Sequence, residues 1–211
     1  MNLKIRNKIG REEFDYQALM SALSGYASPR DKVTALLRSG VVIRVKKGLY
    51  VFGKDYSRGP YSREVLANLV YGPSVISLEY ALAFHGMIPE RVEQITSVAH
   101  GRSRTFNTPV GIFSYKQTRN LSIGVELRGA EKNHFLIATP ERAIADSLKA
   151  DRISGLNTVG EMKGFLVENK RISVDVLAAL NCEILDALAS ALGSRKVKVC
   201  AAFVRHLNRG Q

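Results

Sequence analysis

The stretch RSGVVIRVKKGLYVFG, residues 38–53, decides the fold of the first part of the chain. Apolar residues alternate with basic ones up to Lys46, and Lys46-Lys47-Gly48 then interrupts the run before LYVF resumes it. Alternation over this length indicates a half-buried strand, and glycine supplies the positive φ that a tight turn requires. The stretch therefore predicts a β-hairpin whose turn carries two lysines.

One face of this hairpin is expected to pack on the helices that precede it, and the other to remain outward. The aromatic residues Tyr50 and Phe52 are also expected to pack against those helices rather than to stack on bases. The apolar residues assigned to the packed face are Val41, Ile43, Val45, Leu49 and Val51. The cations left outward are Arg44, Lys46 and Lys47.

Two helices are predicted before the hairpin. Residues 12–24, EEFDYQALMSALS, carry apolar residues at helical spacing. In the next segment Ser28 is a candidate cap, Pro29 suits the first helical position, and Gly40 ends the helix. Helix, helix and hairpin in this order predict a winged helix-turn-helix over residues 1–58.

The remainder, residues 59–211, is predicted to be an α+β domain whose last part, 151–211, is mainly helical. Helices are expected in SREVLANLVYG and SLEYALAFHG, and in the segment that begins at Thr139-Pro140. Strands are expected in EQITSV, VGIFSYKQ, LSIGVELR and HFLIAT, which are rich in β-branched and aromatic residues. The expected fold class is therefore α+β with an N-terminal winged helix.

The charge of the chain is concentrated near its N-terminus. The 211 residues carry 31 Lys and Arg against 19 Asp and Glu, a net charge of +12. Residues 1–60 account for +7 of this, residues 61–150 for +2 and residues 151–211 for +3. This asymmetry favours a polyanion-binding segment joined to a more neutral body, with solubility charge as the alternative.

A winged helix binds DNA with its recognition helix in the major groove, while its wing contacts the backbone or the minor groove. The residues predicted to bind DNA are Arg30, Lys32, Thr34 and Arg38 of the helix and Arg44, Lys46 and Lys47 of the wing. Arginine can pair with guanine, and lysine suits phosphate contacts. The alternative is that the turn lysines only protect an exposed sheet edge.

A second group of cations, Arg102, Arg104 and Arg119, lies in the predicted strand region. This group is interpreted either as a solvated loop or as an additional docking surface for nucleic acid or protein.

The sequence predicts no enzyme, no cofactor and no metal site. Its four histidines are scattered, no phosphate-loop or serine-elbow motif is present, and Gly193-Ser194 lacks the paired aspartates of a nucleotidyltransferase. Glu161 and Lys163 resemble part of a nuclease motif but fall in a predicted helix rather than a strand.

The remaining features indicate an intracellular, cytoplasmic protein. No run approaches the ~18 apolar residues of a membrane span, and the N-terminus has no secretory signal. The two cysteines, Cys182 and Cys200, fit neither a disulfide framework nor a zinc site.

The pattern Gly40, Arg44, Gly48 and Tyr50 resembles the N-terminal winged helix of the AbiE-type antitoxin family. The stretches SLEYALAFHGMIPE and TPERAIADSL resemble the second domain of that family. This resemblance implies an antitoxin of a type IV toxin–antitoxin pair that represses its own operon through inverted repeats in double-stranded DNA. It also implies a nucleotidyltransferase-like toxin as functional partner, without a stable complex.

The leading hypothesis is thus a non-enzymatic, DNA-binding antitoxin and autoregulatory repressor. A stand-alone transcription factor with a ligand-sensing or oligomerisation domain is the main alternative, and a DNA-targeted nuclease is a third.

Overall fold

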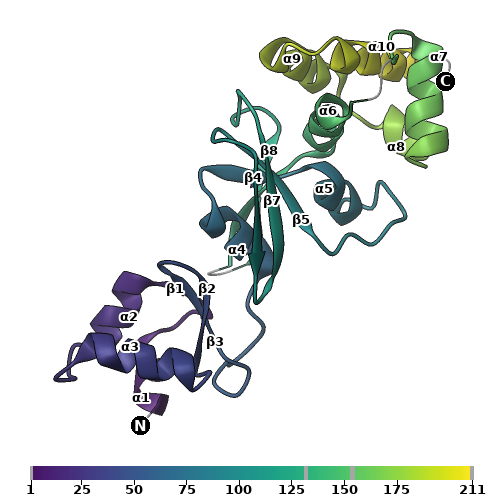
Figure 1. Cartoon of the computed structure of the whole chain (residues 1–211). Coiled ribbons are helices and arrows are strands. Elements are labelled where there is room, and N and C mark those ends of the chain that lie inside the picture. Colours follow the sequence, from purple (N-terminus) through teal and green to yellow (C-terminus); the bar gives the residue numbers. More distant parts are fainter. Residues whose placement is uncertain (1, 131–132, 153–154, 210–211) are drawn as a thin grey trace.

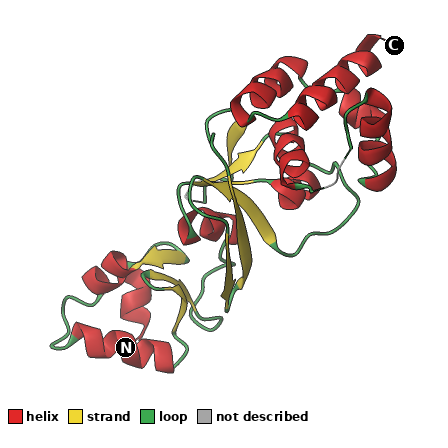
Figure 2. Cartoon of the chain, turned by 45° about the horizontal axis from the view of Figure 1, so that its top comes forward, coloured by secondary structure: helices red, strands yellow, loops and turns green. Residues whose placement is uncertain are grey.

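The computed structural model describes residues 2–130, 133–152 and 155–209, and it shows an elongated molecule with its termini at opposite ends (Figure 1). A small N-terminal unit of helices and short strands comes first. A central sheet with flanking helices follows, and a group of helices forms the far end (Figure 2). This arrangement confirms the α+β class.

The N-terminal unit begins with a helix that the sequence pattern leaves unassigned. Its elements are α1 (Asn2–Lys8), β1 (Glu13–Asp15), α2 (Tyr16–Ala22), α3 (Pro29–Arg38), β2 (Val42–Lys46) and β3 (Leu49–Phe52). The helix expected from residue 12 begins only at Tyr16, because the Asp15 carboxylate accepts a 2.7 Å hydrogen bond from the Ala18 amide and caps α2. Residues 13–15 pair with β3 instead.

The predicted hairpin is present, and Gly48 has a φ of +87° in its turn. Together with β1, the two hairpin strands form a three-stranded antiparallel sheet in the order β1-β3-β2. All four residues of β3 are buried. A strand buried on both sides must lie between two apolar layers.

The two faces of the hairpin pack against different cores, which corrects most of the expected assignment. Val41 packs in the N-terminal core as predicted, whereas Ile43 is partly buried against the core of the following body. Val42, Tyr50 and Phe52 join the helices α1–α3 in the N-terminal core. The predicted packing of Tyr50 and Phe52 is confirmed, with the Phe14 ring centroid 4.7 Å from that of Phe52. Val45, Leu49 and Val51 pack into the core of the following body instead.

The connection between the two cores, residues 53–62, is held by acidic side chains of the N-terminal unit. The Glu12 carboxylate accepts a 3.1 Å hydrogen bond from the Arg58 amide. The Glu13 carboxylate accepts one from the amide of Ser62, the residue that caps the next helix. Burial raises the pKa of Glu13, while the bond from Ser62 works against this rise by stabilising the carboxylate.

The central body is built on a six-stranded mixed sheet in the order β6-β7-β5-β4-β9-β8. Its strands are β4 (Ser74–Ile76), β5 (Ile95–Ala99), β6 (Arg104–Thr108), β7 (Gly111–Gln117), β8 (Val125–Arg128) and β9 (Phe135–Ala138). The strands β5, β7, β8 and β9 match the predicted ones. The sequence pattern misses β4, which has three residues, and β6, which is mostly exposed.

Helices cover both faces of this sheet (Figures 1 and 2). On one face α4 (Arg63–Val70) accepts a 2.6 Å hydrogen bond from the Tyr115 hydroxyl at the Ala67 carbonyl. On the other face lies α5 (Leu78–Phe84), and the Thr96 hydroxyl accepts a 3.1 Å hydrogen bond from the Tyr80 amide in its first turn. Both helices were predicted.

The C-terminal part is helical, as predicted. It comprises α6 (Pro140–Ala150), α7 (Val159–Lys163), the π-helix η1 (Gly164–Asn169), α8 (Val174–Ala178), α9 (Cys182–Leu192) and α10 (Arg195–Arg209). The Thr139 hydroxyl caps α6, as expected from Thr139-Pro140. Both cysteines are free, and burial raises the pKa of Cys200 to about 12. None of the described helices is long and apolar enough to cross a membrane.

Arg142 and Asp146 form a buried ion pair within α6, and their other hydrogen bonds connect this helix to neighbouring loops. The Arg142 Nε donates to the Asp146 Oδ2 at 2.7 Å, and the Ser77 hydroxyl donates to the same oxygen at 2.8 Å. The remaining Arg142 donors reach the carbonyls of Asn120 and Ile123. Burial raises the pKa of Asp146, and the contacts from Arg142 and Ser77 oppose that rise.

Removing one partner of this pair is expected to cost far more than removing both. Asp146→Ala leaves the Arg142 guanidinium buried without its counter-charge, so the free energy of unfolding should fall by about 3–5 kcal/mol. The double variant Arg142→Met with Asp146→Leu should lose clearly less. Urea titration followed by circular dichroism measures both. Equal losses in the single and double variants would contradict the role given to the pair.

Candidate nucleic-acid interface

Helix α3 is positioned by its two ends and by one apolar stripe. Pro29 occupies the first helical position, and Gly40, at a φ of +71°, lets the chain leave the helix. Val33 and Leu36 are buried in the N-terminal core. These contacts turn the opposite side of α3 outward.

That outward side carries Arg30, Thr34 and Arg38, all of them exposed. They are spaced four residues apart and therefore form one line along the helix. The Thr34 hydroxyl donates to the Arg30 carbonyl at 3.3 Å, which holds this short side chain against the helix. Within the described part of the chain, neither arginine forms an ion pair with a carboxylate.

Lys32 lies apart from this line. Its side chain is half-buried, and its Nζ lies 5.5 Å from the centroid of the Tyr26 ring. This cation–π contact fixes the ammonium at the flank of α3. Of the four predicted helix residues, the structure thus brings three onto a common outward line.

The hairpin contributes two exposed cations, Arg44 on the edge strand β2 and Lys47 in the turn. Arg44 lies opposite Tyr50 in the strand register. The strand β2 lies at the edge of the sheet and contacts α3, so these two exposed cations lie on the same unit as the arginines of α3.

Lys46 does not point outward as expected. Its Nζ donates a hydrogen bond to the carbonyl of Val70, the last residue of α4. The reason is an irregularity in the hairpin: the register shifts between Arg44 and Lys46, so strict alternation of faces ends there. Lys46 therefore lies at the junction of the two cores, where it binds the negative end of α4 in the central body.

The second predicted group of cations is brought to one end of the β6–β7 pair. Arg104 lies opposite Tyr115 in the strand register, and the Ser103 hydroxyl accepts a 3.0 Å hydrogen bond from the Gln117 amide. Arg102 and Arg119 therefore follow just beyond the paired residues. All three arginines are exposed. The Arg104 guanidinium lies 5.8 Å from the centroid of the Tyr71 ring.

The described residues contain no group of three or more His, Cys, Asp or Glu able to hold a metal ion. Glu161 and Lys163 lie on helix α7, as predicted, and Asp146 is engaged by Arg142. The partial nuclease motif is therefore not assembled around a common point.

No family model matches this chain, and no curated protein does. The resemblance to the AbiE-type family accordingly stays a prediction. Two solved structures from Helicobacter pylori are similar at low level. One is described as a "putative nucleotidyltransferase", with 13% identity, 70% of this chain and 92% of the other covered, and a TM-score of 0.32. The other, JHP933, has 13% identity, coverages of 70% and 89%, and a TM-score of 0.33.

These matches contradict two predictions made from the sequence. The sequence predicts a DNA-binding antitoxin and autoregulatory repressor that is not an enzyme, whereas one of the two similar structures is described as a "putative nucleotidyltransferase". We withdraw both predictions. At these TM-scores the matches assign no activity in their place. Neither structure bears on which polyanion the N-terminal cations bind.

Sequence reasoning missed three cations of the C-terminal helices, Lys149, Arg195 and Lys196, which line one cavity. The available signal was the run Arg195-Lys196-Val197-Lys198 after Gly193-Ser194. It places basic residues in the first helical turn, where acidic ones are usual.

The position of Lys46 generates a prediction that separates it from its neighbour. Lys46→Met should lower the free energy of unfolding by about 1–2 kcal/mol, because a charge-assisted bond to a helix end is lost. Lys47→Met should change it by less than about 0.5 kcal/mol, as surface substitutions usually do. Mass spectrometry after brief acylation should also show slower modification of Lys46 than of Lys47. Equal rates together with equal stabilities would place Lys46 in solvent.

Proposed function

We propose that the N-terminal unit is a winged-helix module that binds double-stranded DNA, with α3 in the major groove and the β2–β3 hairpin on the flanking backbone. The proposal concerns binding alone and includes neither repression nor antitoxin activity. The observation that carries it is the outward line of Arg30, Thr34 and Arg38 on α3, with no described carboxylate paired to either arginine.

The chemistry of this line suits a duplex. An arginine that no carboxylate engages is available to pair bidentately with the O6 and N7 of a guanine edge. Thr34 is short and lies between the two arginines, so the helix axis can approach the bases closely. Arg44 and Lys47 are exposed on the hairpin and provide the positive charge that phosphates require.

The distribution of charge supports the same partner. Residues 1–60 hold +7 of the net +12, so the N-terminal unit is the most strongly basic part of the chain. A basic face on one element, beside a hairpin with two accessible cations, is the usual electrostatic footprint of duplex recognition. The alternative, solubility charge, predicts no dependence on which cation is removed.

A binding titration separates these alternatives. Fluorescence anisotropy with a labelled duplex should be recorded at several salt concentrations for the full chain. Lys47→Ala and Arg44→Ala should each flatten the slope of log K against log salt by about 0.9, the value for one lost phosphate contact. Arg38→Ala should cost about 1–3 kcal/mol on a preferred sequence and relax the preference.

Two lysine variants serve as controls for the same loss of charge. Lys163→Ala removes an exposed cation from α7 in the far helical part, and Lys46→Ala removes the junction cation. Both should leave the salt slope unchanged. Identical slopes for Lys47→Ala and Lys163→Ala would refute the proposed interface.

A further inference from the structure

A cavity of about 570 Å³ lies between the central sheet and the C-terminal helices, where the end of β7, the end of α6 and the α9–α10 turn meet. Four of its ten lining residues are cations and none is acidic. The cations are Arg119, Lys149, Arg195 and Lys196. Figure 1 places α9 and α10 at the end of the molecule opposite the N-terminal unit, so this cavity is separate from the proposed DNA interface.

Two of these cations are held in place by neutral acceptors. The Lys149 Nζ donates to the Leu192 carbonyl at 2.7 Å, and the Lys196 Nζ donates to the Asp151 carbonyl at 2.8 Å. A carbonyl orients an ammonium without cancelling its charge. Each ammonium retains further donors for a ligand. Among the described residues, Arg119 and Arg195 pair with no carboxylate.

The basic character extends into two adjoining hollows. One shares Gly193, Ser194 and Arg195 with the cavity and adds Lys198. The other shares Gln117, Thr118 and Lys149 with it and adds Lys116. Together the three hollows form what we call the α6–α10 groove, and its six cations come from β7, the loop after it, α6 and α10.

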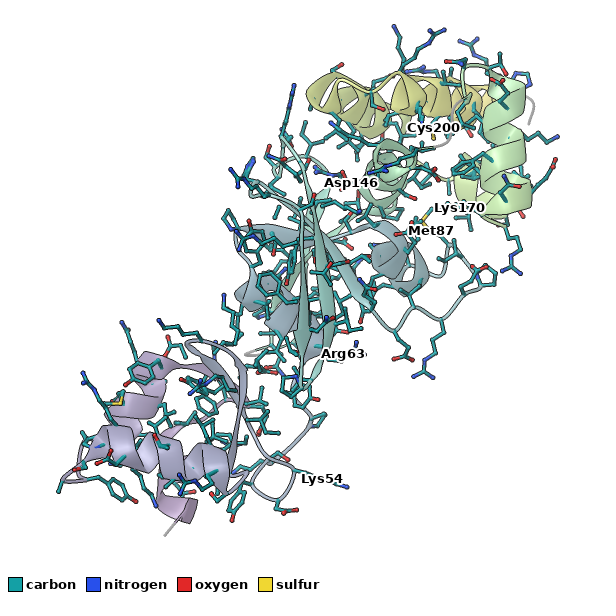
Figure 3. The ribbon with its side chains drawn as sticks, viewed as in Figure 1. Lys54, Arg63, Met87, Asp146, Lys170 and Cys200 are labelled. Atoms are coloured by element: carbon teal, nitrogen blue, oxygen red, sulfur yellow. The ribbon has the colours of Figure 1, made fainter. Side chains whose placement is uncertain are left out.

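The two carboxylates of this groove are already engaged. Asp146 binds Arg142 and Ser77, and Figure 3 shows it on α6 between the sheet and the C-terminal helices. Asp186 pairs with Arg205. The Lys149 charge also acts on Asp146. The six cations of the groove nevertheless outnumber its two carboxylates, each of which is paired with an arginine outside the lining, and like charges repel one another.

The start of α10 adds to this excess. Arg195, Lys196 and Lys198 lie in its first turn, where the positive end of the helix dipole disfavours cations. Gly193 ends α9 in the left-handed region, and the Ser194 hydroxyl accepts the Val197 amide at 3.5 Å. The amides of Arg195 and Lys196 precede the first intrahelical bond of α10 and add further donors. An anion in the groove would relieve each of these unfavourable terms.

We propose that the α6–α10 groove binds a ligand carrying two or more linked phosphate groups. Phosphate fits because its oxygens accept from arginine, lysine and free helix amides alike. More than one phosphate is required because the cations extend over three adjoining hollows. This chemistry is shared by free polyphosphates and by a nucleic-acid backbone.

Isothermal titration calorimetry on the full chain at low ionic strength measures the affinity for two probes, pyrophosphate and a short single-stranded oligonucleotide. Arg119→Ala and Arg195→Ala should each weaken binding by about tenfold, the effect of one lost charge-assisted bond. Arg209→Ala removes the same charge from the other end of α10 and should change affinity less than twofold. Arg38→Ala on α3 should leave pyrophosphate binding unchanged.

The two probes distinguish the source of the phosphate. Dependence on Arg119 and Arg195 with pyrophosphate indicates a small polyphosphate ligand, and dependence with the oligonucleotide alone indicates a nucleic-acid backbone. If Arg209→Ala weakens both probes as much as Arg195→Ala does, or if neither probe binds, the site is refuted. The α3 titration with duplex DNA is unaffected by this outcome, so the two proposals fail separately.

A second variant excludes loss of folding as the cause. Arg195→Glu places an acidic residue in the first turn of α10, where the dipole favours it. Its melting temperature without ligand should be no lower than that of the unmodified chain, while pyrophosphate should no longer raise it. A rise with pyrophosphate equal to that of the unmodified chain would overturn the proposal.

Discussion

The structure depends on one short strand, β3, which has no exposed side. Tyr50 and Phe52 belong to the N-terminal core, and Leu49 and Val51, which alternate with them, belong to the core of the central body. Successive side chains of a strand point to opposite faces, so four residues are enough to serve two cores. The bonds of Glu12, Glu13 and Lys46 across the junction then fix the direction of the connection. The hairpin therefore contributes to the cores of both units.

The sequence predicts most elements of this fold, because their signals are local. Ser62 and Thr139 cap helices through contacts within four residues, and Gly48 makes its turn from its own φ. Two of the missed elements depend on distant partners. The strand β1 exists because it pairs with β3, and β4 gains its place between β5 and β9. A three-residue segment has too few positions to show a period, so no pattern could identify either.

The residues of the candidate site also separate into those with local signals and those placed by distant contacts. Arg30, Thr34 and Arg38 were predictable, because helical spacing alone sets which face they share. Lys46 was not, since its direction follows from a register shift and from the end of α4, which lies 24 residues later. The cations of the α6–α10 groove come from segments between residues 116 and 198. Only the topology of the sheet and the turn between α9 and α10 brings them together.

Because β3 is buried on both sides, cutting the chain after the hairpin exposes one of its apolar faces. A fragment that ends after residue 58 would keep its helices and its own aromatic cluster, but it would present Val45, Leu49 and Val51 to water. An apolar strip beside the open edge of β2 is a template for pairing with another copy. The isolated N-terminal unit should therefore self-associate, and a monomeric fragment would need polar residues at those three positions.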